Sequence, residues 1–381
     1  MINAESRSME WINYVSSLYP SLDKTLIEKS IRAFSLLESL VRSGCPFTFK
    51  GGTACMLHLG SSKRLSIDID VICPPGTDIK KYVEEYSDEY GFKKIDLVER
   101  KSSHNVPKSH AKFFYQVSYV TSSEEDKILL DVLFEDIHYG KVEQLPIKSP
   151  FLKIDGEDVL VNVPSVADIL GDKLTAFAPH TTGVPFFKEK RNCSLEIIKQ
   201  MFDVASLFDV VSDFKQTRDT FIKFAVIELG YRELENLSYK DILLDTINTS
   251  LCIALRGIVN PEDFVQLQNG IKRIGGLIIG EHYIIDTAIK DAAKAAYLAT
   301  IILQNINSKV KRFADSSVDE IRNMTPNELV KESTMLRDEI AEMKRRVHLG
   351  EVQNPRVLRV KRRELARMLT ILSEHLAKEK A

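Results

Sequence analysis

The sequence lacks any apolar run close to twenty residues long. A helix that crosses a membrane needs about 20 consecutive apolar residues, so a membrane-spanning helix is excluded. Its five cysteines form no Cys-x-x-Cys pair, and neither a disulfide framework nor a structural zinc site follows from their spacing. The first residues also lack the basic and then apolar layout of a secretory signal. Together these absences predict a cytoplasmic protein in a reducing compartment with no membrane partner.

The chain does contain a large apolar fraction, 44% of 381 residues, which is enough for two or three globular domains. The 52 Lys+Arg and 54 Asp+Glu residues nearly cancel. The basic residues are nevertheless concentrated, because residues 344–367 hold nine basic and two acidic side chains. Such a block is either a surface that binds nucleic acid or a solvated helix face.

The hydrophobic pattern predicts an α+β fold. Helical spacing covers residues 10–43 and 54–59, and the pattern is helical again from about residue 164. Strand-like segments occupy residues 47–49, 65–72, 113–120 and 127–134. Residues 305–317 are polar and are interpreted as a linker.

The last part of the chain predicts two helices. Thr325-Pro326-Asn327-Glu328 is a capping box, and Gly350 with Asn354-Pro355 ends one helix and starts the next. Apolar residues follow each start at matched helical spacing: Leu329, Leu336, Ile340, Met343 and Val347, then Leu358, Leu365, Leu369, Leu372 and Leu376. Two matched stripes joined by a short loop favour an antiparallel helical hairpin.

The sharpest candidate for chemistry combines two glycines with two carboxylates. Asp68 and Asp70 alternate in a predicted strand, so both point to one face. Neighbouring carboxylates repel each other unless a cation lies between them, and hard oxygen ligands with open positions suit Mg²⁺. Upstream, Gly51 and Gly52 precede a helix expected to start after Thr53, whose free N–H groups favour a phosphate. The alternative is a solvated strand face and a tight turn.

A two-metal phosphoryl transfer needs a third carboxylate, and Asp131 is the best candidate. It lies within the apolar segment Ile128–Phe134, where an acid has to be paired, metal-bound or at a rim. The alternative is an edge-strand aspartate that faces water. Lys173 on a predicted helix is either a clamp for the leaving pyrophosphate or an ordinary surface lysine. For Lys199 and Asp203 on the next helix, the alternative to a functional role is likewise an ordinary surface position. The histidines show no metal-ligand spacing.

The segments Phe49–Ala54 and Arg64–Asp70 resemble the opening motif of the AbiEii-like nucleotidyltransferases, a branch of the polymerase-β-type superfamily. The resemblance continues through Asp131, Lys173 and Lys199-x-x-x-Asp203, over about residues 10–310. It implies a polymerase-β-like catalytic domain and a toxin of a toxin–antitoxin system, which transfers a nucleotide from an NTP, in some members onto tRNA ends. A cognate antitoxin is then a further expected partner.

The same resemblance implies roles for individual residues. Asp68, Asp70 and Asp131 would hold Mg²⁺ (or Mn²⁺), and Lys173 would act with them in catalysis on the triphosphate. The implied nucleotide-binding residues are Lys50, Gly51, Gly52, Thr53, Ser66, Lys199 and Asp203. One position departs from the family pattern, since Gln200 stands where the first acid of the last motif is expected.

Residues from about 316 to 381 resemble another family, ribosomal protein twenty-nine of the large subunit. The segments that carry this likeness are residues 319–325, 350–356 and 362–372. The family is a small helical hairpin bound to ribosomal RNA, in agreement with the two predicted helices. It implies phosphate contacts, which fixed basic side chains on a helix provide, by Arg356, Arg359, Arg362, Arg363 and Arg367.

The sequence therefore predicts a catalytic domain over residues 1–163, a helical domain over 164–308, a linker over 309–317 and a ribosomal-protein-like hairpin over 318–381. The predicted function is Mg²⁺-dependent transfer of an NMP from an NTP to a tRNA or protein hydroxyl, with a hairpin that binds ribosomal RNA in the large subunit. The alternative is a structural constituent of that subunit with a catalytically idle N-terminal extension. A join of two adjacent genes also remains open.

Overall fold

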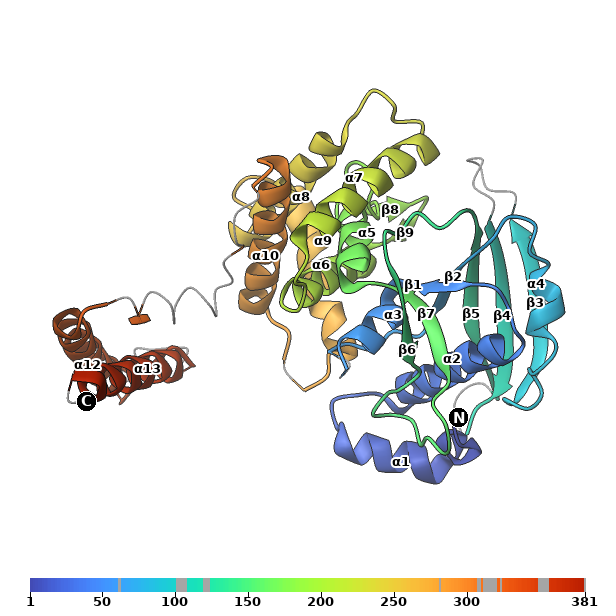
Figure 1. Cartoon of the computed structure of the whole chain (residues 1–381), viewed down its shortest axis with the longest axis horizontal. Coiled ribbons are helices and arrows are strands. Elements are labelled where there is room, and N and C mark those ends of the chain that lie inside the picture. Colours follow the sequence, from blue (N-terminus) through green and yellow to red (C-terminus); the bar gives the residue numbers. More distant parts are fainter. Residues whose placement is uncertain are drawn as a thin grey trace. The chain divides into compact units, whose positions relative to one another are not determined.

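The computed structural model describes residues 1–60, 63–100, 108–118, 124–280, 282–306, 310, 321–322, 324–348 and 356–379. The chain forms two compact units, Met1–Asn307 and Ser308–Ala381 (Figure 1). The first unit combines a five-stranded sheet with many helices, and the described part of the second is mainly a pair of helices. This arrangement confirms the α+β fold class. The finer division of the first unit near residue 164 stays a prediction.

The main sheet has the strand order β1-β2-β5-β4-β3. Strands β2 and β5 pair in parallel, whereas the other neighbouring pairs are antiparallel. In β5 the buried residues Ile128, Leu130 and Val132 alternate with partly exposed ones, because successive side chains of a strand point to opposite faces. The five strands are β1 (Thr48–Lys50), β2 (Ile69–Cys73), β3 (Phe92–Arg100), β4 (Lys108–Gln116) and β5 (Glu125–Phe134).

The register of the sheet places three charged residues in a row. Lys50 on β1 is paired with Asp70 on β2, and Asp70 is paired with Asp131 on β5. Side chains of directly opposed residues on neighbouring strands share a face of the sheet. Residues that are far apart in sequence therefore meet on one face.

The helices predicted over residues 10–43 are confirmed as α1 (Met9–Leu18) and α2 (Lys24–Arg42). Ser8 and Asp23 accept backbone hydrogen bonds at their N-termini, as capping residues do. Helix α2 is buried along most of its length and packs against β2 and β5. The short 3₁₀ helix η1 (Ala4–Arg7) precedes α1, and the short helix α4 (Ile79–Val83) also contacts α2.

Two boundaries near the glycine pair differ from the sequence prediction. Helix α3 spans Gly51–His58 and thus begins before Thr53. The strand predicted over residues 65–72 is shorter, since regular pairing starts only at Ile69. The reason is a competing interaction: the Leu65 N–H donates to the Leu277 carbonyl (2.8 Å), and Arg64 forms a bridge with Ile278. Asp68 therefore lies just before β2 instead of within it.

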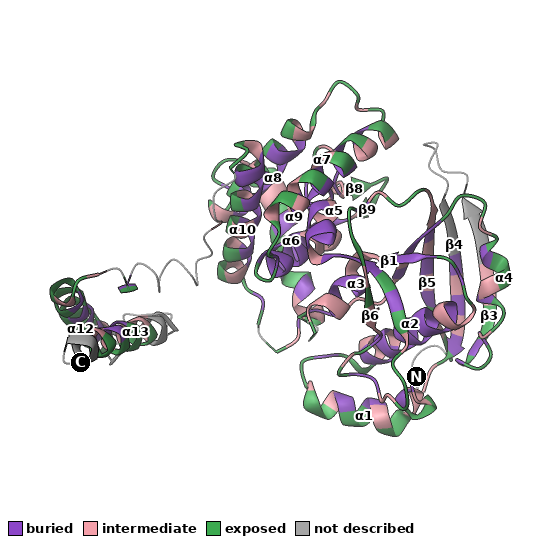
Figure 2. Cartoon of the chain, viewed as in Figure 1, coloured by how far each residue is buried: buried purple, intermediate pink, exposed green. Residues whose placement is uncertain are grey.

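After residue 164 the first unit is mostly helical, as predicted, with one small hairpin that the pattern did not indicate. Helix α6 is almost wholly buried at the centre of this region (Figure 2). The helices are α5 (Val166–Ala176), α6 (Ser194–Phe208), α7 (Phe214–Tyr231), α8 (Tyr239–Ala254), α9 (Pro261–Ile274), the 3₁₀ helix η2 (Gly275–Leu277) and α10 (Ile285–Leu303). The small hairpin among them is formed by β8 (Phe187–Lys188) and β9 (Arg191–Asn192), and β6 (Val142–Pro146) pairs with β7 (Leu160–Pro164) just before this region.

The second unit contains the predicted pair of helices, α12 (Pro326–His348) and α13 (Arg356–Glu379). The capping box is confirmed, because Thr325 and Glu328 exchange backbone and side-chain hydrogen bonds of 2.8–3.3 Å. Lys361 near the start of α13 pairs with Glu339 late in α12 (2.5 Å), which fits antiparallel helices. Of the predicted linker at 309–317, all but Val310 lies outside the described residues, as do Gly350 and Asn354-Pro355.

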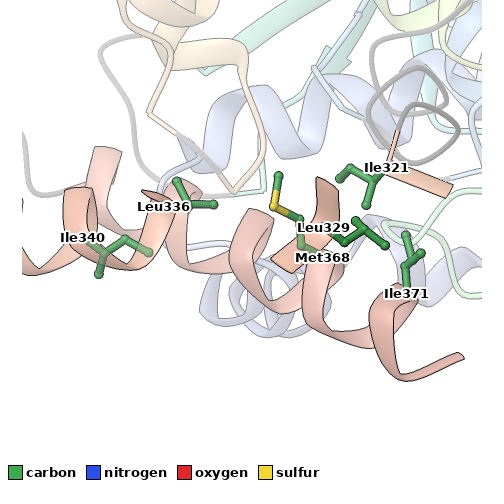
Figure 3. Close-up of a cluster of buried hydrophobic side chains, with 6 residues drawn as sticks. All are labelled: Ile321, Leu329, Leu336, Ile340, Met368 and Ile371. Atoms are coloured by element: carbon green, nitrogen blue, oxygen red, sulfur yellow. The ribbon is translucent and has the colours of Figure 1, made fainter. Parts of the chain in front are cut away.

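The seam of this hairpin is apolar, but two residues of the predicted stripes, Met343 and Leu369, lie outside the buried cluster. The side chains of Val347 and Leu376 lie outside those that the structure describes. Met368 and Ile371 are the most buried residues of α13, whereas Leu369 is only half-buried and lies outside the cluster. Leu358, Leu365 and Leu372 pack against the cluster as predicted, and Met368 takes the inward position next to Leu369. Figure 3 shows the buried cluster, whose members are Ile321, Leu329, Leu336, Ile340, Met368 and Ile371.

No helix among the described residues is both long and apolar enough to cross a membrane. All five cysteines are buried and free.

Candidate active site

Three carboxylates lie at the centre of the candidate site. Burial and then the charge of Asp131 raise the pKa of Asp70 to about 6, against the opposing charges of Lys173 and Lys50. Burial also raises the pKa of Asp68, where Lys199 opposes and Asp131 adds to the rise. The structure therefore brings Asp68, Asp70 and Asp131 close enough to repel one another, and a cation would relieve that repulsion.

The carboxylates do not form a closed metal cage. Within the part of the chain that the structure describes, no group of three or more His, Cys, Asp or Glu side chains is arranged to hold a metal ion as it stands. Mg²⁺ usually takes one or two protein carboxylates and completes its shell with water and substrate phosphates. Paired Asp70 and Asp131, with Asp68 just before the strand, fit that mode of binding.

The glycine pair faces these carboxylates directly. Gly51 has a φ of +79°, which favours glycine, and a Cβ atom there would lie 2.0 Å from Asp70 Oδ2. A Cβ atom on Gly52 would lie 2.7 Å from Ser66 Oγ. The Thr53 hydroxyl donates to the Asp68 carbonyl (2.7 Å), so the turn also holds the backbone before β2. Any other residue at Gly51 would displace the Asp70 carboxylate.

The N-terminus of α3 opens at the same place. Its N-cap residue is Lys50, whose side chain has no acceptor atom for the first N–H groups of the helix. Uncapped N–H groups and the positive end of the helix dipole favour an anion. Together with the Ser66 hydroxyl they form a suitable seat for phosphate oxygens.

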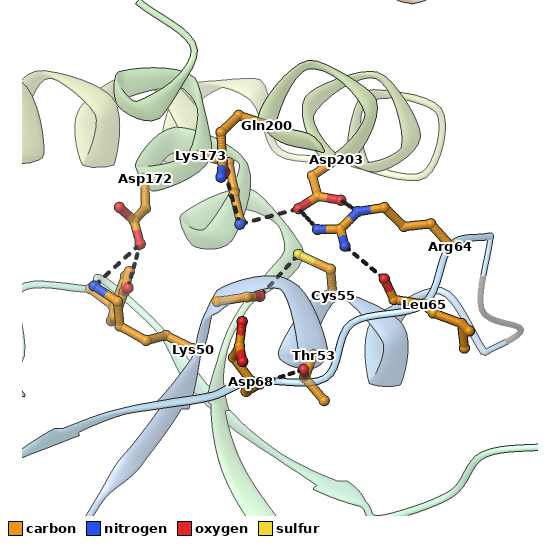
Figure 4. A network of polar contacts seen from close by, with 12 residues as sticks. Lys50, Thr53, Cys55, Arg64, Leu65, Asp68, Asp172, Lys173, Gln200 and Asp203 are labelled. Atoms are coloured by element: carbon orange, nitrogen blue, oxygen red, sulfur yellow. Dashed lines mark hydrogen bonds and ion pairs between the residues drawn. The ribbon is translucent and has the colours of Figure 1, made fainter. Parts of the chain in front are cut away.

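A buried ion-pair network borders this seat (Figure 4). Asp203 on α6 accepts two hydrogen bonds of 2.7 Å from Arg64 and pairs with Lys173 on α5 at 3.1 Å. Lys173 also donates to Gln200 (3.0 Å). Burial alone would raise the pKa of Asp203, but the Arg64 and Lys173 cations hold it below its usual value.

This network changes the interpretation of two residues. The side chain of Lys173 is 11% exposed and that of Asp203 is 4% exposed, so neither is an ordinary surface residue. Asp203 contacts two cations and thereby positions Lys173. Gln200, which stands where an acid was expected, supplies a neutral acceptor to Lys173. Lys199 lies near Arg64 and Asp68, and burial and then Arg64 lower its pKa.

Lys50 lies between the carboxylate row, which is Asp70 and Asp131 on the neighbouring strands β2 and β5, and the helical region. Its Nζ lies 3.8 Å from Asp172 Oδ2, and the Tyr139 hydroxyl donates to the same oxygen (2.7 Å). Burial works against the charge of Lys50, but Asp172 and then Asp70 raise its pKa above the usual value. The ammonium group therefore stays charged between Asp70 and Asp172.

Sequence reasoning missed Arg64 and Asp172. Arg64 is part of the motif around Ser66 and Asp68, and its buried position next to Asp203 has no local periodic signal. Asp172 is adjacent to Lys173 in the sequence, but its pairing with Lys50 depends on the tertiary fold and could not be predicted. A carboxylate that is buried, as Asp203 is, requires cationic partners. That requirement was the one signal that could have pointed to Arg64.

The predicted RNA contacts lie on α13. Arg362, Arg363 and Arg367 are exposed. Arg356 and Arg359 belong to the same helix, but their side chains lie outside those that the structure describes. The described arginines are thus available to a polyanion.

The family of this chain follows from comparison with known proteins. Residues 35–249, more than half of the chain, match the family described as "Nucleotidyl transferase AbiEii toxin, Type IV TA system". The chain belongs to this family. The matched range of this AbiEii nucleotidyltransferase contains the carboxylate row, the glycine turn and the ion-pair network.

The remaining comparisons concern the end of the chain and the fold. Residues 319–375 match the ribosomal L29 protein family. A solved structure named "putative nucleotidyltransferase from H. pylori" is similar, with 14% identity and a TM-score of 0.39, and the likeness covers 76% of this chain and all of that one. No curated protein matches the chain.

Proposed function

We propose that the first unit of this AbiEii nucleotidyltransferase transfers an NMP from an NTP to a hydroxyl of tRNA or of a protein, with Mg²⁺ as the resident ion. The observation that supports this most directly is the paired position of Asp70 and Asp131 beside the Gly51 turn. Carboxylates on one side and a phosphate seat on the other are what nucleotidyl transfer requires.

Each group of residues has a role in this reaction. Asp68, Asp70 and Asp131 would hold Mg²⁺, which supplies charge neutralisation at the phosphate oxygens when bound. The α3 N-terminus, the glycine turn and Ser66 bind the β- and γ-phosphates. Lys173, held by Asp203, stabilises the negative charge that develops on the leaving pyrophosphate.

The bond changes balance without a further co-reactant. The acceptor oxygen forms a bond to the α-phosphorus, and the bond between that phosphorus and the bridging oxygen breaks. The proton of the acceptor hydroxyl passes to the carboxylate of Asp131. Pyrophosphate leaves next to Lys173.

The test uses α-labelled ATP, GTP, CTP and UTP with Mg²⁺, total tRNA and the protein itself as acceptors. Asp131→Asn should lower the rate of label transfer by about 10²–10³-fold or more. Asp126→Asn is the matched control, because Asp126 lies on the same strand and pairs with Lys29 at 3.0 Å. Equal rates for both variants, or no transfer by the wild type with any NTP, would contradict the proposal.

We further propose that the hairpin of the second unit binds ribosomal RNA and delivers the enzyme to the large subunit. The match of residues 319–375 to the ribosomal L29 family supports this, and the exposed arginines of α13 supply positive charge. The alternative, a structural component with an idle enzyme, predicts co-sedimentation with large subunits but no label transfer. Full-length protein that stays in the supernatant at moderate salt would contradict both forms.

A cognate antitoxin is a further proposed partner, because the family description names a toxin–antitoxin system. Co-expression of the cognate antitoxin should restore growth if the chain is toxic. The control is the Asp131→Asn variant, which should need no antitoxin.

A further inference from the structure

A cleft next to the carboxylate row has no role in the reaction described so far. It has a volume of about 370 Å³ and lies between α5, the segment Thr182–Lys188 and α7. That volume is within the range of about 300–1,000 Å³ typical of small-molecule sites, so it suits a single small ligand better than a folded polymer. We call it the Asp172 cleft, after the residue that lines it and pairs with Lys50.

The walls of the Asp172 cleft are fixed by short hydrogen bonds. The Thr182 hydroxyl donates to the Thr175 carbonyl (2.8 Å), and the Gly183 N–H donates to the Ala178 carbonyl (2.7 Å). The Val184 N–H donates to the Ala176 carbonyl (3.1 Å). A preformed wall reduces the entropy lost when a ligand binds.

The chemistry of the lining matches a nucleoside. Tyr231 supplies an aromatic ring, and Val184 with Ala176 supplies apolar surface. Glu228 and Arg232, which form an ion pair, present an acceptor and donors side by side. A nucleobase offers a flat face for stacking and an edge with both donors and acceptors.

The order of residues across the sheet indicates whether the cleft lies on the side of the donor nucleotide or of the acceptor. Asp131, Asp70 and Lys50 follow one another on β5, β2 and β1. Lys50 then contacts Asp172 (Figure 4). In the proposed reaction the acceptor hydroxyl approaches the Asp131 end of this row. The cleft lies beyond the opposite end, past Lys50, which is the side of the donor nucleotide.

We propose that the Asp172 cleft binds the nucleoside of the donor NTP, and that Glu228 reads the edge of its base. This rests on the proposed nucleotidyl transfer. A carboxylate accepts hydrogen bonds from the exocyclic amino groups of adenine, guanine and cytosine, whereas uracil offers only its ring N3–H, flanked by two carbonyl oxygens that repel a carboxylate. The cleft therefore favours an amino-bearing base over uracil.

The experiment measures binding by titration calorimetry of the full chain with Mg²⁺ and each of the four NTPs, and separately with inorganic tripolyphosphate. Val184→Trp fills the cleft and should weaken NTP binding about tenfold or more, while tripolyphosphate, which needs only the phosphate seat, binds as before. The matched control is Val259→Trp, because Val259 lines a separate cleft of about 380 Å³ between α8 and α9. Retained tripolyphosphate binding also shows that the variant is folded.

The outcomes separate this inference from the proposed function. Unchanged NTP binding by Val184→Trp, or wild-type protein that binds NTPs no tighter than tripolyphosphate, overturns the inference even if label transfer occurs. If the wild type transfers no label but binds NTPs in a way that Val184→Trp weakens, the proposed function is contradicted instead of the inference. As a second variant, Glu228→Gln should shift the ratio of UTP to CTP affinity about tenfold towards UTP, and an unchanged ratio overturns the role of Glu228.

Discussion

The two units of the chain use charge in opposite ways. In the first unit Arg64 and Lys173 both pair with Asp203, and all three side chains are nearly buried. In the hairpin Arg345 and Glu342 form an ion pair in which both side chains are more than half exposed. A buried pair fixes positions, since breaking it leaves an uncompensated charge, whereas an exposed pair contributes little and leaves the charge available to a partner. The buried charges of the first unit fix the positions of site residues, whereas the exposed charges of the hairpin remain available to attract a partner.

The strongest test of this comparison removes the shared carboxylate of the network. Asp203→Ala should lower the free energy of unfolding of the first unit by about 3–5 kcal/mol, because Arg64 and Lys173 lose their common partner. Urea denaturation followed by Trp11 fluorescence measures it, since Trp11 is the one tryptophan and lies in the first unit. Glu342→Ala is the control and should leave amide exchange in α12 unchanged. A comparable loss for both variants would remove the distinction.

The second prediction uses pH. The pKa of Asp70 is raised to about 6, so the folded state binds its proton more tightly than the unfolded state, and ionisation destabilises the fold. Without divalent ions, wild-type stability should therefore fall between about pH 4 and pH 6 relative to Asp70→Asn, by roughly 2–3 kcal/mol. Parallel stability profiles of the two proteins in EDTA, again by Trp11 fluorescence, would show that the carboxylates do not repel as described.

The third prediction concerns the apolar seam, on which the hairpin depends instead of ion pairs. Met368→Ala should destabilise the hairpin by about 2 kcal/mol, because Met368 is buried in the cluster. Leu369→Ala should cost less, since Leu369 lies outside that cluster. Hydrogen exchange of peptides from α12, measured by mass spectrometry on the full chain, reports the difference. Faster exchange in Leu369→Ala than in Met368→Ala would restore the stripe predicted from sequence.

The smallest expected effect concerns the exposed arginines. Replacement of Arg362, Arg363 and Arg367 by Gln should leave stability unchanged and should reduce the slope of log K against log[salt] for large-subunit ribosomal RNA by about 2–3. Filter binding at several salt concentrations measures the slope. The same triple replacement should not alter label transfer to free tRNA, and a drop in that rate would mean that the hairpin also serves the enzyme directly.

The hairpin was readable from sequence because its signals are local. A capping box, a seven-residue spacing and a charged block all lie within neighbouring turns of the same helices. The error at Leu369 arose because Leu369 and Met368 are adjacent and both apolar, so spacing alone leaves the rotation of the helix open by one residue.

The candidate site was only partly readable. The glycine pair and Asp68, Asp70 and Asp131 follow from motif and alternation, and the structure places them together. The length of β2 was overestimated because the backbone of Leu65 pairs with Leu277, more than two hundred residues later. The bond between Arg64 and Asp203 depends on the same kind of long-range packing, which no local pattern encodes.

That contact between Leu65 and Leu277 has a practical consequence for anyone who trims the protein. The AbiEii match ends at residue 249, so an expression fragment cut at the family boundary would discard the backbone partner of the loop that carries Ser66 and Asp68. Such a fragment retains every motif residue of the candidate site but loses the backbone contact that orients the loop with Ser66 and Asp68. The shortest version worth purifying extends at least through η2.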